Sequence, residues 1–236
     1  MHQFEVREFV PLNLFGFDVS FTNASLFMVL ALVASIGLLW FLARKQEVVP
    51  KTPQAIAEAL FNFIKTTAAD SIGEGYKNYL PFIFSIFIFV LMGNLLGLLP
   101  YSFTITSQLA VVGGFAVFCT IVSIIVGIKH QGLSWFRIFF PQGVPVLMAP
   151  ILVPVEIISF ISKPFSLTVR VVLNMFVGHI LLKVAAGYVY SMGLLGALPL
   201  LAVCLLVVFE LFVAFLQAYI FTILTSIYLG QSIHSH

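Results

Sequence analysis

A long uncharged stretch constrains the fold of this chain more than any other feature of its sequence. No side chain within residues 81–128 carries a formal charge, and further apolar runs cover residues 24–43, 150–190 and 198–229. Only 8% of the 236 residues are charged, which is too few to cover the surface of a water-soluble domain. The chain is therefore predicted to be an all-α membrane protein.

The apolar runs and the segments between them predict one membrane domain over residues 1–236. Residues 1–23 alternate aromatic and charged side chains, which is typical of an interfacial arm rather than of a signal peptide. Residues 24–43 have the length of about 20 residues that a spanning helix needs, and Arg44 and Lys45 follow at once. The positive-inside rule then places the arm on the outer side of the membrane.

Residues 53–71 form the one segment with an amphipathic pattern. Thr52 is predicted to cap this helix and Pro53 to occupy its first position. Four apolar side chains are expected to share one face of this helix: Ile56, Leu60, Phe63 and Ile64. Because charged side chains lie off this face, we predict a surface helix rather than a span. The polar residues 73–78 are expected to form the turn that follows it.

Residues 81–128 are predicted to form a helical hairpin, divided at LLPYSFTITSQ. Its first member contains one strongly polar group, Asn94, with Gly93 and Gly97 beside it. Small residues allow neighbouring helices to approach closely in a membrane. An interhelical hydrogen bond is therefore expected at Asn94.

Two final segments are too long to cross a membrane upright. Residues 150–190 would extend about 60 Å as one helix, about twice the hydrocarbon thickness, and residues 198–229 about 48 Å. Each must break or slant. We expect residues 150–229 to form a long, slanted hairpin packed against something large, which brings the number of membrane crossings to five.

The first of these long segments carries a polar stripe. At 100° per residue, six side chains fall within an arc of about 80°: Glu156, Ser159, Lys163, Ser166, Arg170 and Asn174. His179 and Lys183 make a second polar face, and Glu210 and Gln217 share a face on the next segment. An Arg within a membrane costs at least about 2.5–3.5 kcal/mol on insertion scales, so it marks a functional site by default.

Several functions compete for these residues. In a purely structural role, Glu156 would pair with Lys163, and Arg170 would bind backbone carbonyls. A metalloenzyme would need a ligand set such as HExxH, and a serine hydrolase a nucleophile elbow; neither motif occurs, and no basic run suggests nucleic acid. A secondary transporter could use Arg170 to bind an anionic substrate, but no internal repeat supports it. Ion translocation, with carboxylates and imidazole as relay groups, fits the polar faces best.

Three stretches closely resemble subunit a of the F-type ATP synthase, the stator subunit of its membrane sector. They are PVEIISFISKPFSLTVRVVLNMFVGH (residues 154–179), FELFVAFLQAYIFTILTSIYL (209–229) and FVLMGNLLGLLPYSFTITS (89–107). The resemblance implies that Arg170 is the family's essential arginine, which faces the ring of c subunits and separates two proton half-channels. This chain departs from the family at Leu173, Phe176 and Val177, which are larger than the usual residues.

The resemblance also implies a role for each remaining polar residue. It assigns Glu210, His179, Asn94, Asn174 and Gln217 to the inlet and the surroundings of Arg170, and Glu156, Ser159 and Ser162 to the outlet. Some members of the family carry the imidazole and carboxylate of His179 and Glu210 in the opposite order. Either order keeps one acid and one imidazole together.

The expected partners follow from the same resemblance. They are the c-subunit ring, peripheral-stalk b-type subunits, other ATP synthase subunits, membrane lipid and protons, without nucleic acid, metal or cofactor. The subunit would have no catalytic chemistry of its own. It would reside in the mitochondrial inner membrane or the bacterial plasma membrane as a multi-pass protein.

Overall fold

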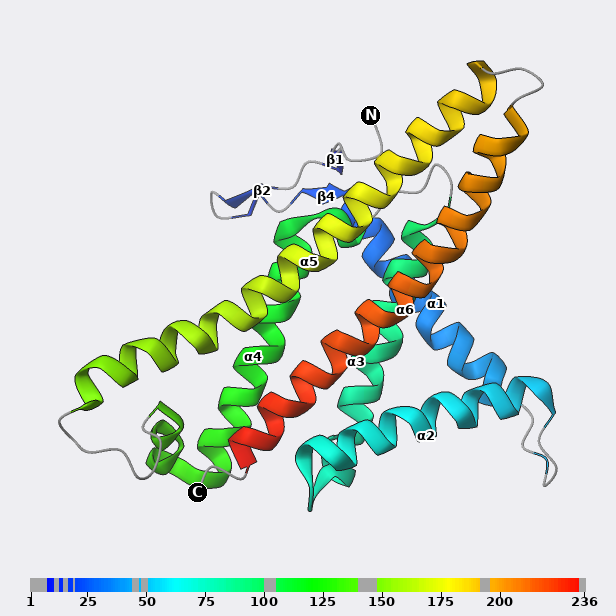
Figure 1. The fold of residues 1–236 in the computed structure, drawn as a ribbon. Coiled ribbons are helices and arrows are strands. Elements are labelled where there is room, and N and C mark those ends of the chain that lie inside the picture. Colours follow the sequence, from blue (N-terminus) through cyan, green and yellow to red (C-terminus); the bar gives the residue numbers. More distant parts are fainter. Residues whose placement is uncertain are drawn as a thin grey trace. The chain divides into compact units, whose positions relative to one another are not determined.

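Helices make up most of the structure, a computed structural model that describes residues 8–10, 13–14, 17–18, 20–43, 47, 51–99, 105–139, 148–191 and 196–233 (Figure 1). The α-helices are α1 (Asn23–Ala43), α2 (Thr52–Ile72), α3 (Tyr76–Gly97), α4 (Leu109–Gln131), α5 (Ala149–Ser191) and α6 (Ala197–Ile233). Two 3₁₀ helices, η2 (Ile105–Ser107) and η3 (Gly132–Phe139), lie before and after α4.

Short antiparallel strands occur before α1. β1 (Glu8–Val10) pairs with β4 (Phe21–Thr22), and β2 (Asn13–Leu14) pairs with β3 (Phe17–Asp18). The alternation of aromatic and charged residues in this segment indicated an interfacial arm but did not predict pairing.

Five helices within the described residues are long and apolar enough to cross a membrane. They are α1, α3, α4, α5 and α6, while α2 lacks a sufficiently apolar window. The predicted all-α membrane fold, with five long apolar helices and one amphipathic helix, is confirmed.

The long segment over residues 150–190 forms one helix although it contains two prolines. α5 is continuous through Pro154 and Pro164. Pro164 has no N–H, so it cannot donate to the carbonyl of Phe160 one turn earlier. The hydroxyl of Tyr228 on α6 donates to that carbonyl at 3.4 Å. A side chain of another helix thus replaces the missing backbone hydrogen bond.

The chain divides into two compact units, each made from parts of several helices. The first unit comprises Met1–Phe41, Ile88–Val112 and Arg170–Tyr219. The second unit comprises Leu42–Phe87, Gly113–Val169 and Ile220–His236. α3, α4, α5 and α6 each contribute residues to both units.

An aromatic cluster forms part of the core of the second unit. Trp135 of η3 makes edge contacts with Phe139 and Phe160, and Phe160 makes one with Tyr228. The indole N–H of Trp135 donates to Ser232 on α6 at 3.4 Å. This hydrogen bond satisfies the polar end of a buried tryptophan, as buried indoles usually require.

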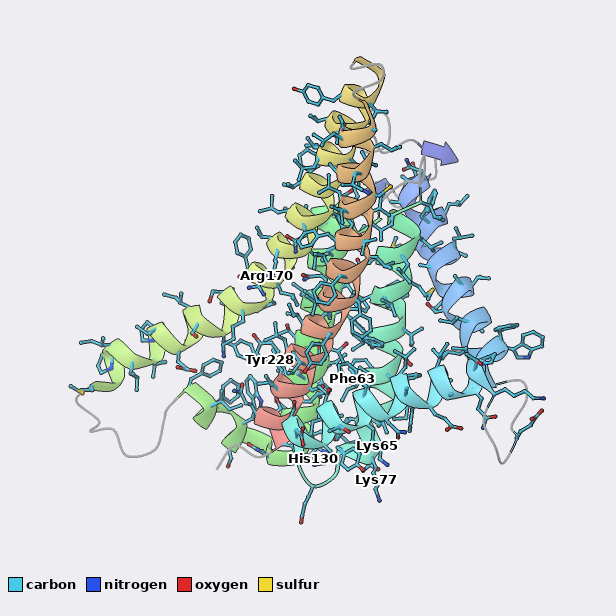
Figure 2. The ribbon with its side chains drawn as sticks, turned by 45° about the vertical axis from the view of Figure 1, so that its right-hand side comes forward. Phe63, Lys65, Lys77, His130, Arg170 and Tyr228 are labelled. Atoms are coloured by element: carbon cyan, nitrogen blue, oxygen red, sulfur yellow. The ribbon has the colours of Figure 1, made fainter. Side chains whose placement is uncertain are left out.

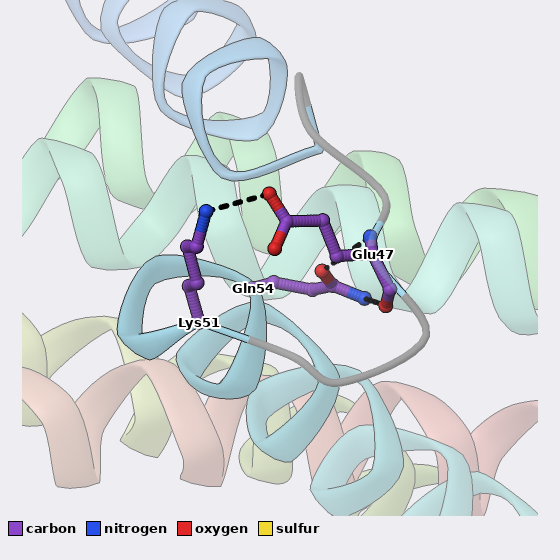
Figure 3. Close-up of polar contacts among 3 residues, drawn as sticks. All are labelled: Glu47, Lys51 and Gln54. Atoms are coloured by element: carbon purple, nitrogen blue, oxygen red, sulfur yellow. Dashed lines mark hydrogen bonds and ion pairs between the residues drawn. The ribbon is translucent and has the colours of Figure 1, made fainter.

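The start of α2 differs from the prediction. Thr52 is the first helical residue and not the cap; Lys51 holds the cap position and makes no capping hydrogen bond with its side chain. Glu47 and Gln54 instead bond reciprocally, from the Glu47 N–H to Gln54 Oε1 (3.0 Å) and from Gln54 Nε2 to the Glu47 carbonyl (3.1 Å) (Figure 3). These two hydrogen bonds link the backbone of Glu47 to the first turn of α2.

Only part of the apolar face of α2 is buried. Ile56 is 51% exposed and Phe63 is 40% exposed, whereas Ile64, Ala68 and Ile72 are buried. These three lie four residues apart in the second half of the helix, where Ser71 and Ile72 contact Gly230 of α6. Tertiary contact with α6, and not hydrophobicity alone, selects the buried stripe.

The turn after α2 is shorter than expected. It covers only residues 73–75, and α3 begins at Tyr76. Gly73 and Gly75 adopt positive φ values of 72° and 95°, a conformation that glycine accepts without steric cost. Two such glycines reverse the chain in three residues, so Tyr76, Lys77 and Asn78 become helical.

The close approach of α2 and α6 generates a prediction. A Cβ on Gly230 would overlap the backbone carbonyl of Ser71, which cannot rotate away. Gly230→Ala should therefore lower the stability of the protein by about 1–3 kcal/mol, the usual cost of overpacking. Thermal unfolding of the protein in mild detergent measures the effect.

The matched control is Gly37→Ala in α1, where a Cβ would meet no atom within 4 Å. That substitution should leave the midpoint temperature of thermal unfolding unchanged or raise it, because alanine has a higher helix propensity than glycine. Equal midpoints for the two variants would contradict the contact.

Candidate functional site: polar groups of α3, α5 and α6

The first unit gathers polar residues from three helices into an otherwise apolar region. α3 contributes Asn94, α5 contributes Arg170, Asn174 and His179, and α6 contributes Glu210 and Gln217. The C-terminal part of α5 and the N-terminal part of α6 lie side by side (yellow and orange in Figures 1 and 2). They run antiparallel, since Gly178 lies against Glu210 and Gly196 against Val189.

Asn94 joins α3 to α6. Its side chain is fully buried, and its Nδ2 donates to the backbone carbonyl of Ala214 at 3.0 Å. The interhelical hydrogen bond predicted for Asn94 is confirmed. Gln217, which is 2% exposed, follows Ala214 by one turn on α6. Two buried amides thus belong to the same helix contact.

Glu210 of α6 approaches α5 at Gly178, the residue before His179. The Glu210 side chain fills the space that a Cβ on Gly178 would occupy, one residue before His179. His179 is 9% exposed, and its ring is hydrogen-bonded to the backbone of Gly97 on α3. Glu210 itself makes no hydrogen bond or ion pair within the described residues. The acid and the imidazole are therefore neighbours without being a direct pair.

Arg170 has a different setting from these enclosed groups. Its side chain is exposed on α5 (Figure 2). The side chain of Asn174, one turn later, is exposed as well. Within the described part of the chain, the guanidinium forms no hydrogen bond or ion pair. The structural alternative, in which Arg170 satisfies backbone carbonyls of its own chain, finds no support there. Leu173 and Val177 are also exposed, so large side chains stand beside the arginine.

The second unit contains the other predicted site residues. Glu156 and Ser159 are half-buried, whereas Ser162 is exposed and donates its hydroxyl hydrogen to the Ser159 carbonyl at 3.0 Å. The ammonium of Lys163 lies 5.9 Å from the centroid of the Tyr228 ring. No ion pair links Lys163 to Glu156 among the residues described, so the proposed pairing of these two is not observed. A cation–π contact takes its place.

Two residues with clear roles at these positions were not predicted from the sequence. Gly178 leaves room for Glu210, and Tyr228 contacts both Phe160 and Lys163. Pro164 was the available signal for Tyr228, because a proline within a helix leaves a carbonyl that needs a donor. No local signal connected Gly178 to Glu210. Among the described residues, no group of three or more His, Cys, Asp or Glu could hold a metal ion.

Comparison with known proteins gives this arrangement a context. Residues 25–230 match the family described as ATP synthase A chain. The chain belongs to this family. It is 45% identical to ATP synthase subunit a of Rhodospirillum rubrum over 237 aligned residues, which cover 100% of this chain and 98% of the relative. It is 44% identical to the subunit a of Agrobacterium fabrum and 42% identical to that of Mesorhizobium japonicum, with 99% of this chain and 96% of each relative covered.

Membership in the ATP synthase A chain family confirms the resemblance found in the sequence. The chain is a multi-pass subunit of the membrane sector of ATP synthase, where proton transport is the family's function, and it works with other subunits of that enzyme. This favours the ATP synthase prediction over the secondary transporter. The roles of single residues stay predictions.

The contact between Gly178 and Glu210 generates the second testable prediction. Gly178→Ala should displace the Glu210 carboxylate, because an added Cβ would overlap it. If Glu210 relays protons, as the sequence predicts, proton flux through the membrane sector should fall by about tenfold to 100-fold, since small displacements of a reacting group have effects of that size. Passive proton uptake by vesicles stripped of the catalytic sector measures the flux.

Gly187→Ala on the same helix is the control, because a Cβ there meets no atom within 4 Å. Its flux should equal that of the unchanged protein. Normal flux in the Gly178 variant, at equal amounts of assembled complex, would show that the position of Glu210 does not matter.

Proposed function

We propose that this chain forms two offset proton half-channels beside the c-subunit ring, with Arg170 as the barrier between them. The observation that carries the proposal is the exposed guanidinium of Arg170 on an apolar helix, without a partner among the described residues. A charge in such surroundings is costly unless an opposite charge meets it. A carboxylate on a neighbouring subunit of the ring would supply that charge.

The chemistry of guanidinium suits a barrier. Arg170 cannot deprotonate at any relevant pH, so it cannot pass on a proton itself. Its positive charge stabilises the deprotonated form of a ring carboxylate and repels a proton that would move directly between the half-channels. A ring carboxylate therefore releases its proton to the outlet before it passes Arg170, and accepts a new one from the inlet afterwards.

The polar cluster of the first unit supports an inlet formed by Glu210, His179, Asn94 and Gln217. Carboxylates and imidazoles accept and release protons, whereas amides donate and accept hydrogen bonds without changing charge. Glu210 and His179 would relay the proton, and Asn94 and Gln217 would hold the path in place. Asn174, one turn after Arg170, would lie where the path reaches the ring.

The polar residues of the second unit support an outlet. Glu156 would accept the released proton, and the hydroxyls of Ser159 and Ser162 would line its path. The half-buried setting of Glu156 and the exposure of Ser162 fit a path that leads to water.

The surface of α6 supports contact with lipid and with other subunits. Leu198, Leu205 and Phe209 are more than half exposed, and such side chains need an apolar neighbour. We propose that α5 and α6 form the slanted hairpin that borders the c-subunit ring, within one membrane domain over residues 1–236. Peripheral-stalk b-type subunits would contact other helices. Because the relatives named above come from bacteria, we place the chain in a bacterial plasma membrane.

The barrier function matters energetically. One proton that crosses a potential of 100 mV releases about 2.3 kcal/mol. Several protons must be coupled to the synthesis of one ATP, so each proton that leaks past Arg170 loses energy as heat. The arginine therefore affects the coupling of flux to rotation as well as its rate.

Arg170→Ala tests the barrier. ATP-driven proton pumping should fall by at least about 100-fold, since loss of a preorganised charge typically has an effect of about 10²–10³. The complex should still assemble, because the exposed Arg170 makes no contact on which the described fold depends. Acidification of membrane vesicles, normalised to assembled complex, gives the measurement.

Lys65→Ala removes an exposed positive charge from α2 and serves as the control. Its pumping should be unchanged. Coupled pumping at the normal rate in the Arg170 variant would rule out the proposed role.

Glu210→Gln tests the inlet. The amide keeps the shape of the carboxylate but cannot relay a proton, so passive proton flux should fall by about 100-fold, the smaller end of the range for acid–base groups. The amount of assembled complex should change little. The same vesicle assay with Glu74→Gln, a substitution in the exposed turn before α3, controls for the loss of one negative charge. Unchanged flux in the Glu210 variant would exclude the relay.

A further inference from the structure

Three buried polar atoms in the described residues have no hydrogen-bond partner. They are Asn94 Oδ1, Thr106 Oγ1 and Gln217 Nε2. Buried polar groups in proteins are almost always hydrogen-bonded, to the protein or to ordered water. All three residues belong to the first unit. Their concentration in one unit calls for a common explanation.

Contacts between elements connect the three residues. Asn94 donates to the carbonyl of Ala214, and Gln217 follows Ala214 by one helical turn, so the two amides border the same contact of α3 with α6. Thr106 lies in η2, and its methyl group is 3.7 Å from the place of a Cβ on Gly93, the residue before Asn94. Thr106 therefore packs on α3 beside the buried asparagine.

The orientation of the Asn94 amide is determined by its neighbour. A backbone carbonyl such as that of Ala214 only accepts hydrogen bonds, so the Asn94 atom that faces it must be the amide nitrogen. The Asn94 oxygen is then the atom without a partner.

We propose that Asn94, Thr106 and Gln217 bind an ordered water molecule, and that Thr106 is thereby a further residue of the proton inlet. The chemistry of the three atoms identifies the ligand. The amide oxygen accepts, the amide nitrogen donates, and the hydroxyl does both. Neither an anion nor a metal ion can satisfy such a set, because an anion needs donors and a cation needs acceptors. Water both donates and accepts, and buried waters typically make about three hydrogen bonds.

A water at this place would extend the relay described above, and the inference rests on that proposed inlet. Asn94 lies one helical turn before Gly97, whose backbone is hydrogen-bonded to His179. The water bound to Asn94 would therefore lie about one helical turn along α3 from Gly97, where the imidazole of His179 is bonded. Thr106 would hold the water by its hydroxyl, so it acts as a positioning residue.

Thr106→Val and Thr106→Ser test the proposal. Valine keeps the shape of threonine and removes the hydroxyl, whereas serine keeps the hydroxyl. Passive proton flux in stripped vesicles should fall by about fivefold with valine, the factor that corresponds to one lost hydrogen bond, and should recover with serine. Thermal stability should not fall with valine, because valine removes a buried hydroxyl that has no protein partner.

Thr67→Val is the matched control. Thr67 and Thr106 are equally exposed, at 8%, but the Thr67 hydroxyl donates to the carbonyl of Phe63 within α2. Its flux should be normal. A high-resolution cryo-EM map of the whole complex should contain water density within hydrogen-bonding distance of Thr106 Oγ1, and the Thr106→Val map should lack it.

The outcomes separate the two proposals. If Glu210→Gln slows the flux and Thr106→Val does not, the water site is wrong and the inlet remains. If neither substitution slows the flux, the proposed inlet itself fails. A map in which the Thr106 hydroxyl bonds a protein group instead of water would also overturn the site.

Discussion

The need of polar groups for partners in apolar surroundings governs this structure. A membrane offers no water to an unpaired carbonyl or amide, so each such group must find its partner within the protein or its complex. Helices meet this need for most of the backbone. Where the sequence interrupts a helix or adds a polar side chain, the partner comes from elsewhere, as Tyr228 does for the carbonyl of Phe160 and Ala214 does for the amide of Asn94.

Glycines set how closely these partners can approach. Gly178 lets the Glu210 side chain reach the backbone of α5, and the methyl group of Thr106 packs on α3 at Gly93. In both places a small residue stands next to a polar one, at His179 and at Asn94. Hydrogen bonds and proton transfer need short distances. The glycines, which have no side chain, are therefore as much a part of the polar site as the polar residues are. Arg170 is exposed and lies apart from these buried polar residues, so its charge is accessible from outside the chain.

The sequence predicted those parts of the fold that depend on local composition. Runs of apolar residues determine where helices can cross a membrane, and the described part of the chain contains five such helices. The predicted cap of α2 was wrong, because Lys51 holds that position, and the sequence did not predict which residues of α2 are buried, because contact with Gly230 of α6 selects them. Both depend on residues that are distant in the chain or on a geometry that a periodic pattern does not contain.

The candidate site shows the same limit. Helical periodicity identified which side chains share a face of α5, and the resemblance to a family assigned their roles. Neither could indicate which residues of the other helices contact those side chains. The contact of Glu210 with Gly178, and that of Lys163 with Tyr228, join different helices and follow only from the fold. The hydrogen bond of Asn94 was foreseeable, because an amide in an apolar helix has few alternatives.

The hydrogen bond from Tyr228 to Phe160 has a consequence for how this protein can change over time. Phenylalanine at position 228 would leave the Phe160 carbonyl without a hydrogen-bond donor as long as residue 164 is proline. Once residue 164 carries an N–H, the helix can satisfy that carbonyl itself, and the tyrosine hydroxyl becomes dispensable there. The two substitutions are thus tolerated in one order and penalised in the other, so a lineage would have to replace Pro164 before Tyr228.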